Sequence, residues 1–346
     1  MFKKLSFLAA ALGLTFLYAC NQNTSKTDNR KDSASVSSEN ELFLQVEFLN
    51  EQGKEKLEDS ISAILLGEGF KWTEGPLWID EKEMLLFSDI PNNKVFKWTE
   101  KEGMTEYLHP AGLTTDAGEG REPGSNGLIY NSKGQLVLCQ HGDHAISTLD
   151  ADVDAPEARF VVLADHYEGK RLNSPNDVIE DSKGQYYFTD PDYGVASKED
   201  KELSFNGVFK IHTSGDLKLL IDSISNPNGL ALSPDENSLF IANSNHEAPY
   251  LYKYLMDDEG DPTQGEVFFD FTPYLDKGAG GLDGFKIDKQ GYIYTSGPGG
   301  IWLISPEGEA LARIPLENRT SNCWLSEDES SLYVTNTDKV FKLILK

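Results

Sequence analysis

Six times along the chain, a carboxylate or carboxamide residue stands about five or six positions ahead of a polar turn and a short apolar strand. These residues are Glu74, Asn126, Asn176, Asn228, Asp283 and Asn322. A fixed offset inside a repeated unit means the same geometric place in every unit, so units that close around an axis would point these side chains at one another. The sequence therefore predicts a ring of oxygen ligands.

The chemistry that suits such a ring is the binding of a hard divalent cation. Glu74 and Asp283 supply anionic oxygens, the asparagines supply neutral carbonyl oxygens, and no Cys or His stands at these positions. We expect Ca2+, because several protein oxygens at loose geometry suit it while magnesium prefers to keep water; Zn2+, Mg2+ and Mn2+ remain alternatives. The competing interpretation is that these residues only form turns, as Asn-Gly and Asp-Gly pairs often do. Glu74 argues against it, because Glu is a poor turn former.

The repeated units that carry these residues have the spacing of propeller blades. The turns at Asp80, Asn131, Asp181, Asp235, Asp288 and Glu327 are separated by roughly 51, 50, 54, 53 and 39 residues. Each turn is followed by a second apolar strand, and little room is left for helices. We predict an all-β fold over 42–346: a six-bladed β-propeller of four-stranded antiparallel blades. A β-sandwich or an irregular barrel is the alternative, but neither predicts six equal repeats.

The last repeat ends only a few residues before the C-terminus, too early to complete its own sheet. A strand from the N-terminal part, either FLQVEFL from Phe43 or SAILLG from Ser62, is predicted to close the ring. We expect the five tryptophans to pack within and between the blades.

The first residues have the pattern of a secretory signal. Lys3 and Lys4 precede an apolar run from Leu5 to Tyr18 that is too short to span a membrane. Residues 17–20 resemble a bacterial lipobox, so we expect residues 1–20 to be a signal peptide and Cys20 to be lipidated. Residues 21–41 are polar and predict a flexible tether. The expected location is the bacterial cell envelope, lipid-anchored and either periplasmic or surface-exposed; an ordinary secreted protein is the alternative.

The composition of the chain limits the kinds of molecule that it can bind. A formal net charge of −26 argues against nucleic acids and anionic membrane surfaces, which require a basic footprint, and is compatible with cations and sugar-like substrates. The two remaining cysteines, Cys139 and Cys323, lie in repeats that are not neighbours in a closed ring, so we predict buried free thiols. We expect a monomer that touches the membrane only through its lipid anchor.

Several motifs occur in order at blade spacing: TEGPLWID, SPNDV followed by YFTDPDYG, PNGLALSPDE and GLDGFKIDKQGYIY. Together they resemble the senescence marker protein, gluconolactonase and luciferin-regenerating enzyme family of calcium-dependent propeller hydrolases, from about Glu68 to the C-terminus. The resemblance implies that Glu74, Asn176, Asn228 and Asp283 bind the metal, with Asn176 also able to touch substrate. It also implies a gluconolactonase-like lactonase, a carboxylic ester hydrolase that opens sugar lactones.

Within that implied reaction, a cation can polarise the lactone carbonyl and activate a water, which removes the need for a serine nucleophile. Asp283 is the candidate catalytic base or nucleophile, because a carboxylate beside a dication can stay ionised and still accept a proton. The predicted substrate-binding residues are Asn126, Asn176, His141, Arg171 and Asn322. For His141 a structural role is an equal alternative. Asp190 and Tyr193 are expected to form a structural turn.

Two other functions remain open at this stage. One is a non-catalytic envelope propeller that binds a glycan or a protein and keeps calcium for structure. The other is a related hydrolase acting on organophosphates or on other lactones. The pair Glu74 and Asp283 favours an enzyme, because a purely structural ion does not need open coordination toward solvent.

Overall fold

Short apolar segments with turns between them form almost every regular element. The computed structural model describes residues 41–114 and 122–345, all within one structural unit that spans Val36–Lys346. The predicted signal peptide, Cys20 and almost all of the predicted tether lie outside the described residues. No helix in the described ranges is long and apolar enough to cross a membrane.

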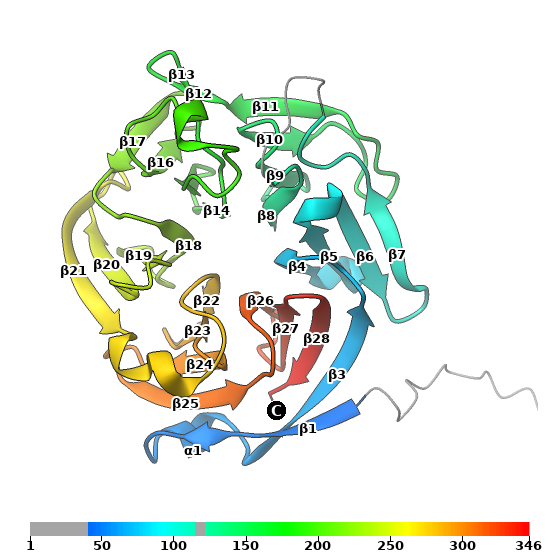
Figure 1. The fold of residues 1–346 in the computed structure, drawn as a ribbon, viewed down its shortest axis with the longest axis vertical. Coiled ribbons are helices and arrows are strands. Elements are labelled where there is room, and N and C mark those ends of the chain that lie inside the picture. Colours follow the sequence, from blue (N-terminus) through cyan, green and yellow to red (C-terminus); the bar gives the residue numbers. More distant parts are fainter. Residues whose placement is uncertain (1–40, 115–121, 346) are drawn as a thin grey trace, which may run out of the picture. The chain divides into compact units, whose positions relative to one another are not determined.

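Six antiparallel sheets form blades around a central axis (Figure 1). Blade 1 consists of β4 (Thr73–Ile79), β5 (Met84–Asp89), β6 (Lys94–Thr99) and β7 (Gly103–Leu108). Blade 2 consists of β8 (Ser125–Tyr130), β9 (Leu136–Gln140), β10 (Ala145–Leu149) and β11 (Phe160–Ala164). Blade 3 consists of β14 (Val178–Glu180), β15 (Tyr186–Asp190), β16 (Gly207–Ile211) and β17 (Leu217–Ile221).

The second half of the ring repeats this plan. Blade 4 consists of β18 (Pro227–Leu232), β19 (Ser238–Asn243), β20 (Tyr250–Met256) and β21 (Pro262–Asp270). Blade 5 consists of β22 (Phe285–Ile287), β23 (Ile293–Gly297), β24 (Gly300–Ile304) and β25 (Ala310–Pro315). Blade 6 consists of β26 (Thr320–Leu325), β27 (Ser331–Asn336), β28 (Lys339–Ile344) and β3 (Ser60–Glu68). The predicted all-β, six-bladed propeller is confirmed.

A strand from the N-terminal part completes blade 6, as predicted. Of the two candidates, the segment from Ser62 does so: β3 pairs with β28 in a register that joins Glu68 to Lys339 and Ser62 to Ile344. The segment from Phe43 contributes β1 (Glu41–Gln45), which pairs with the other edge of β3, and β2 (Glu47–Phe48), which pairs with β25. The N-terminal part therefore joins blades 5 and 6.

Few other elements occur among the described residues. They are the hairpin of β12 (His166–Tyr167) and β13 (Lys170–Arg171), the helix α1 (Gly53–Lys56), and the 3-10 turns η1 (Asp80–Lys82), η2 (Ile90–Asn92), η3 (Lys198–Asp200) and η4 (Thr272–Lys277).

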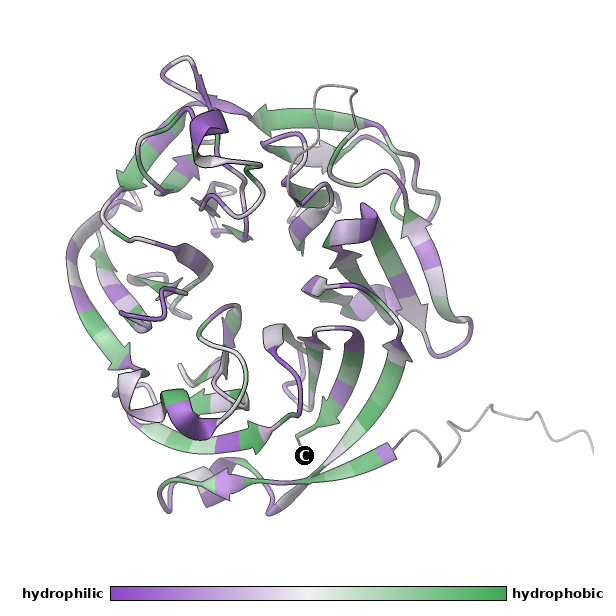
Figure 2. Cartoon of the chain, in the orientation of Figure 1, coloured by the Kyte–Doolittle hydropathy of each residue, from purple (hydrophilic) through white to green (hydrophobic). Residues whose placement is uncertain are grey.

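The core is divided among the contacts between neighbouring blades. In β9, Leu136 and Leu138 pack toward blade 1, whereas Val137 and Cys139 pack toward blade 3. This alternation follows from the two-residue period of a strand. Equivalent clusters occur at the other blade contacts, and Figure 2 shows that outer strands such as β3 and β11 are largely hydrophobic. Each blade is thus held by its two neighbours, which fixes the inner strands around the axis.

Most aromatic predictions also hold. Trp302 is fully buried between blades 4 and 5, and Trp78 stacks on Tyr333 at 4.5 Å between blades 1 and 6. Cys139 and Cys323 are buried free cysteines, as expected. Trp72 is an exception, because it lies at the hub rather than in a blade contact.

Candidate functional site

A cavity of about 260 Å³ lies at the hub, and every blade contributes residues to its wall. Five of the six predicted ring residues line it, one from each of blades 1 to 5: Glu74, Asn126, Asn176, Asn228 and Asp283. Each stands at or just before the start of an innermost strand, β4, β8, β14, β18 or β22, and Figure 1 shows these strands around the axis. The repeat therefore brings distant residues to one place.

Glycines allow the inner strands to approach this closely. A Cβ at Gly75 would lie 2.1 Å from the Asn126 carbonyl oxygen, and one at Gly127 would lie 2.7 Å from the Asn176 carbonyl oxygen. A Cβ at Gly229 would lie 2.6 Å from the Asp283 carbonyl oxygen. The glycine after a ring residue is therefore needed for contact with the next blade. This contact, rather than a tight hairpin turn, accounts for the Asn-Gly pairs.

The inner strands are also bulged at the ring positions. The pairing register of β4 shifts between Glu74 and Leu77, and that of β8 shifts between Ser125 and Leu128. Comparable shifts occur in β18 and β26. A bulge bends a strand and redirects a side chain at the end of a sheet, so it turns these residues toward the axis.

Hydroxyl groups on the second strand of a blade hydrogen-bond to the backbone of ring residues in the next blade. Ser88 donates to the Asn126 carbonyl oxygen at 2.8 Å, and Thr189 donates to the Asn228 carbonyl oxygen at 2.7 Å. Asp190 accepts the backbone N–H groups of Asn173 and Ser174, both at 2.8 Å. Asp190 is thus a structural residue, as expected, and it fixes the loop that leads to Asn176.

The cavity gathers acidic groups that repel one another. Burial, with a smaller contribution from the charge of the nearby Asp177 carboxylate, raises the pKa of Glu74 to about 8. Burial, followed by the charge of Glu74, holds the pKa of Asp283 well above its usual range. The Oδ1 atom of Asp283 is buried and accepts no hydrogen bond from any described residue. An unpaired buried carboxylate oxygen of this kind is costly unless something binds it.

This arrangement fits a hard divalent cation. The donor set is two carboxylates and three carboxamides, all oxygen donors, with no sulfur or imidazole among the cavity-lining residues. A dication between Glu74 and Asp283 would balance both charges and satisfy the unpaired Asp283 oxygen.

Asn322 occupies the sixth ring position but does not line the cavity. Its Oδ1 accepts the Cys323 N–H at 2.8 Å, and its Nδ2 donates to Glu74 at 3.5 Å. A Cβ at Gly284 would lie 1.9 Å from its side-chain carbon, so Asn322 is held against blade 5. The structure places it behind Glu74, where it contacts that residue instead of facing the cavity.

His141 is fully buried and also does not line the cavity. Its Nδ1 lies 3.1 Å from the Glu122 carboxylate, and its Nε2 lies 3.3 Å from Asn126 Nδ2. With a carboxylate at Nδ1, that nitrogen carries the proton and Nε2 accepts from Asn126. The side-chain amide oxygen of Asn126, Oδ1, is then the atom left to face the cavity. His141 is placed to orient Asn126, and Glu122 itself lines the cavity.

Arg171 is not brought to the hub. The β12–β13 hairpin places it in a separate surface pocket with His144 and Asp165, and its guanidinium donates to the Asp200 carbonyl oxygen at 2.9 Å. The short distance in sequence between Arg171 and Asn176 misled the prediction, because the chain turns away between them.

Ten of the cavity-lining residues were not predicted as site residues, among them Trp72, Tyr193, Ser244 and Arg319. Burial, and to a lesser extent the charge of Asp283, raises the pKa of Tyr193 to about 12. The Tyr193 hydroxyl therefore keeps its proton at neutral pH. Trp72 and Arg319 lie two and three residues before the ring positions Glu74 and Asn322. That offset from the repeated motif is the signal that could have identified them.

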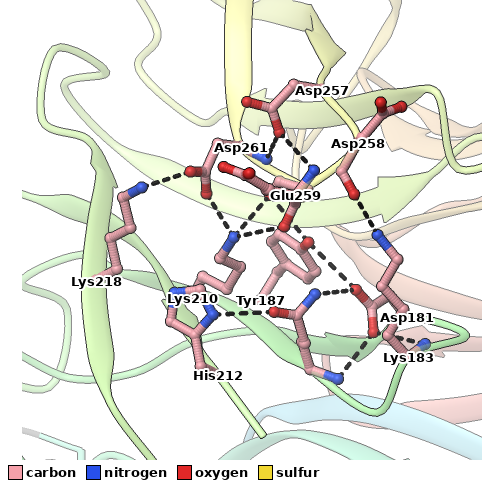
Figure 3. Close-up of polar contacts among 12 residues, drawn as sticks. Asp181, Lys183, Tyr187, Lys210, His212, Lys218, Asp257, Asp258, Glu259 and Asp261 are labelled. Atoms are coloured by element: carbon pink, nitrogen blue, oxygen red, sulfur yellow. Dashed lines mark hydrogen bonds and ion pairs between the residues drawn. The ribbon is translucent and has the colours of Figure 1, made fainter. Parts of the chain in front are cut away.

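A second polar cluster, drawn in Figure 3, lies outside the hub cavity. Carboxylate oxygens of Asp257, Glu259 and Asp261 lie within 4.8 Å of one another. Lys210 is fully buried and donates to Asp261 and to the Glu259 and Gly260 carbonyl oxygens, and Lys218 pairs with Asp261 as well. Lysine ammonium groups already provide positive charge here, so this cluster is a structural network.

A six-bladed propeller with an oxygen-lined hub cavity is the class that fold and site define. The chain belongs to the SMP-30/Gluconolactonase/LRE-like family, whose model matches residues 72–338. It is 39% identical over 295 residues to a gluconolactonase of Zymomonas mobilis, covering 82% of this chain and 81% of that protein. It is 26% identical over 286 residues to regucalcin of Xenopus laevis, covering 79% of this chain and 85% of that protein. The structure of a gluconolactonase from Xanthomonas campestris matches with a TM-score of 0.75 and 27% identity, covering 87% of this chain and 95% of that one.

Proposed function

We propose that this protein is a metal-dependent lactonase that opens sugar lactones at the hub of the propeller. The observation that carries the proposal is the convergence of two carboxylates and three carboxamides, from five different blades, on one cavity. Membership of a family that contains gluconolactonases, and 39% identity to one of them, support the same reaction.

Glu74, Asn176, Asn228 and Asp283 would hold the cation, and Ca2+ is our choice because all four supply oxygen. When bound, such a cation supplies a positive charge that polarises the lactone carbonyl and lowers the pKa of a nearby water. Asn126 and Asn176 offer carboxamides to the hydroxyl groups and ring oxygen of the sugar. The hydroxyl of the half-buried Tyr193, which stays protonated, is a further hydrogen-bond donor at the wall.

Asp283 is the proposed base. Its carboxylate takes a proton from the attacking water, through the oxygen that would not contact the cation, while the water oxygen bonds to the carbonyl carbon. The bond between that carbon and the ring oxygen then breaks, and the ring oxygen takes the proton from Asp283. The product is an open-chain hydroxy acid, which ionises at neutral pH and releases one proton to solvent.

Trp324 contributes to the packing between several blades. Trp324 packs against the cores between blades 1 and 2, 2 and 3, and 6 and 1, and the Lys286 ammonium lies 5.2 Å from its ring.

We also propose that the protein acts in the bacterial cell envelope as a monomer. Support comes from residues 1–20, which have the pattern of a signal peptide ending in a lipobox, and from the polar stretch that follows Cys20. Radiolabelled palmitate should be incorporated into the full-length protein in cells but not into the Cys20→Ser variant. Equal incorporation into both would contradict the lipid anchor.

The reaction is tested by following proton release from glucono-1,5-lactone, with spontaneous hydrolysis subtracted. Wild-type protein with Ca2+ should accelerate hydrolysis. The enzymatic rate should be at least about 100-fold lower for chelator-treated protein and for Asp283→Ala, which is the scale expected for loss of a general base. Asp150→Ala, which changes an exposed carboxylate away from the hub, should match wild type. Absence of metal-dependent acceleration with several lactones would reject the proposal, and a thermal shift by Ca2+ without catalysis would favour a structural ion.

A further inference from the structure

One cationic side chain lines the otherwise acidic hub cavity. Among the described residues that line it, Arg319 is the sole lysine or arginine, while Glu74, Glu122 and Asp283 are acids. Its guanidinium lies 5.9 Å from the centre of the Trp72 ring. The flat guanidinium can rest on an aromatic face, which restricts its plane without using its N–H groups. Arg319 is exposed, so it belongs to the rim of the cavity and not to its floor.

The guanidinium of Arg319 has no hydrogen-bond or ion-pair partner among the described residues. The other arginines in the described ranges differ. Arg313 pairs with Glu47, Arg159 pairs with Glu157, and Arg171 donates to the Asp200 carbonyl oxygen. Arg319 therefore presents five N–H donors that no other described residue uses.

The rim beside Arg319 carries further donors. Gly280 and Gly281 line the same cavity, and neither backbone N–H donates a hydrogen bond to a described residue. A Cβ at Gly281 would meet no atom within 4 Å, and the nearest atoms to one at Gly280 include the Arg319 Cα at 3.6 Å. Packing therefore does not explain glycine at position 281. A rim of unpartnered backbone N–H groups and a guanidinium is suited to an anion.

We propose, building on the proposed lactonase function, that the preferred lactone carries an anionic group, a carboxylate or a phosphate, which Arg319 binds at the rim. A guanidinium has only donors and matches the paired oxygens of these groups in a bidentate manner. The hydroxyls of a bound sugar would face acids and carboxamides at the cavity wall, which can accept hydrogen bonds from them. Neutral aldonolactones remain substrates, but poorer ones.

The test compares kcat/KM for three lactones: glucono-1,5-lactone, its 6-phosphate and glucaro-1,4-lactone, which retains a free carboxylate. Wild type should prefer at least one charged lactone over the neutral one. Arg319→Gln should lower the charged-to-neutral ratio by at least about 10-fold, mainly through KM, as expected for a hydrogen bond to a charged group. Arg319→Lys should keep part of the preference. Arg159→Gln, at an exposed arginine outside the cavity, should leave the ratio unchanged.

The comparison also shows whether Arg319 binds a phosphate or a carboxylate. The charged lactone whose kcat/KM falls more in Arg319→Gln carries the preferred group. A ratio within about twofold of wild type for both would overturn the inference, even if every lactone is hydrolysed. If wild type hydrolyses none of them, the lactonase proposal fails, and binding still tests Arg319. In that case 6-phosphogluconate or glucarate should raise the melting temperature of wild type more than gluconate does, and Arg319→Gln should abolish the difference. Equal shifts in the two proteins would overturn the inference.

Discussion

His141 illustrates how a buried residue can act on the site through a neighbour. It connects the Glu122 carboxylate to the Asn126 carboxamide through contacts of 3.1 Å and 3.3 Å. A carboxamide can otherwise present either oxygen or nitrogen to a ligand, and this contact selects the oxygen. The expected consequence is preference for a hydrogen-bond donor, such as a sugar hydroxyl, at that point of the cavity.

A double-mutant cycle tests this role of His141. His141→Leu should raise KM for glucono-1,5-lactone by about 10-fold, because loss of one oriented hydrogen bond costs roughly 0.5–1.5 kcal/mol. Asn126→Ala should have a similar effect, and the double variant should be no worse than Asn126→Ala alone, since both remove the same contact. Additive losses would mean that His141 does not act through Asn126.

Glu74 gives the metal-free protein a distinct dependence on pH. Its pKa is raised from 4.5 to about 8, chiefly by burial. Because the folded pKa lies above the unfolded value, the stability that it contributes is fully present below about 4.5 and is lost as the pH rises through about 8. Chelator-treated protein should therefore lose stability over this window, and added Ca2+ should stabilise it most at the alkaline end.

Thermal unfolding at a series of pH values, with chelator and with Ca2+, measures this effect. The Glu74→Gln variant is the control, because it cannot titrate and should show a flatter profile with chelator. Parallel curves for chelator-treated and Ca2+-loaded wild type would contradict the interpretation.

At the scale of elements, the Lys210 network joins blades 3 and 4 (Figure 3). Lys210 on β16 is fully buried and holds the Asp257–Asp261 turn, whereas Lys218 reaches the same Asp261 from solvent with its side chain half exposed. Lys210→Met should destabilise the protein by about 3 kcal/mol, because it leaves a partly buried carboxylate and two carbonyl oxygens without that donor. Lys218→Met should cost less than about 1 kcal/mol.

Urea unfolding followed by tryptophan fluorescence compares the two lysine variants. Equal midpoints for Lys210→Met and Lys218→Met would show that burial of the ammonium group contributes little. Added Ca2+ should not restore the Lys210→Met variant if the turn is a structural network and not a cation site.

The elements also explain what the sequence could and could not predict. The blades were predictable because each repeats a polar turn between apolar strands. The choice between the segments at Phe43 and Ser62 was not, since both are short and largely apolar and only the pairing with β28 separates them. Arg171 is close to Asn176 in sequence but is carried off by a hairpin, and Asn322 has the right offset but is held under Gly284. Arg319 stands three residues before Asn322, but that offset does not say that its side chain reaches the cavity, so its place at the rim required the structure.

At the scale of the molecule, the ring depends on β3. This strand pairs with β28 and buries Ile61 and Ala63 against blade 6. A chain that begins at Phe70 should therefore lose cooperative unfolding, because β28 becomes an unpaired edge and its core contacts are lost. A chain that begins at Glu41 should melt within a few degrees of the full-length protein, since it keeps every described strand. Calorimetry compares the two, and an intact transition in the chain from Phe70 would contradict the closure by β3.

The central claim is that Glu74 and Asp283, from blades 1 and 5, share one cation in the hub cavity. Anomalous diffraction from crystals soaked with Ca2+ tests it most directly. The account predicts one strong peak in the cavity, within about 2.3–2.6 Å of oxygens from both residues, and loss of the peak in Glu74→Gln or Asp283→Asn. A hub without a peak, or a peak confined to Asp257, Glu259 and Asp261, would contradict it.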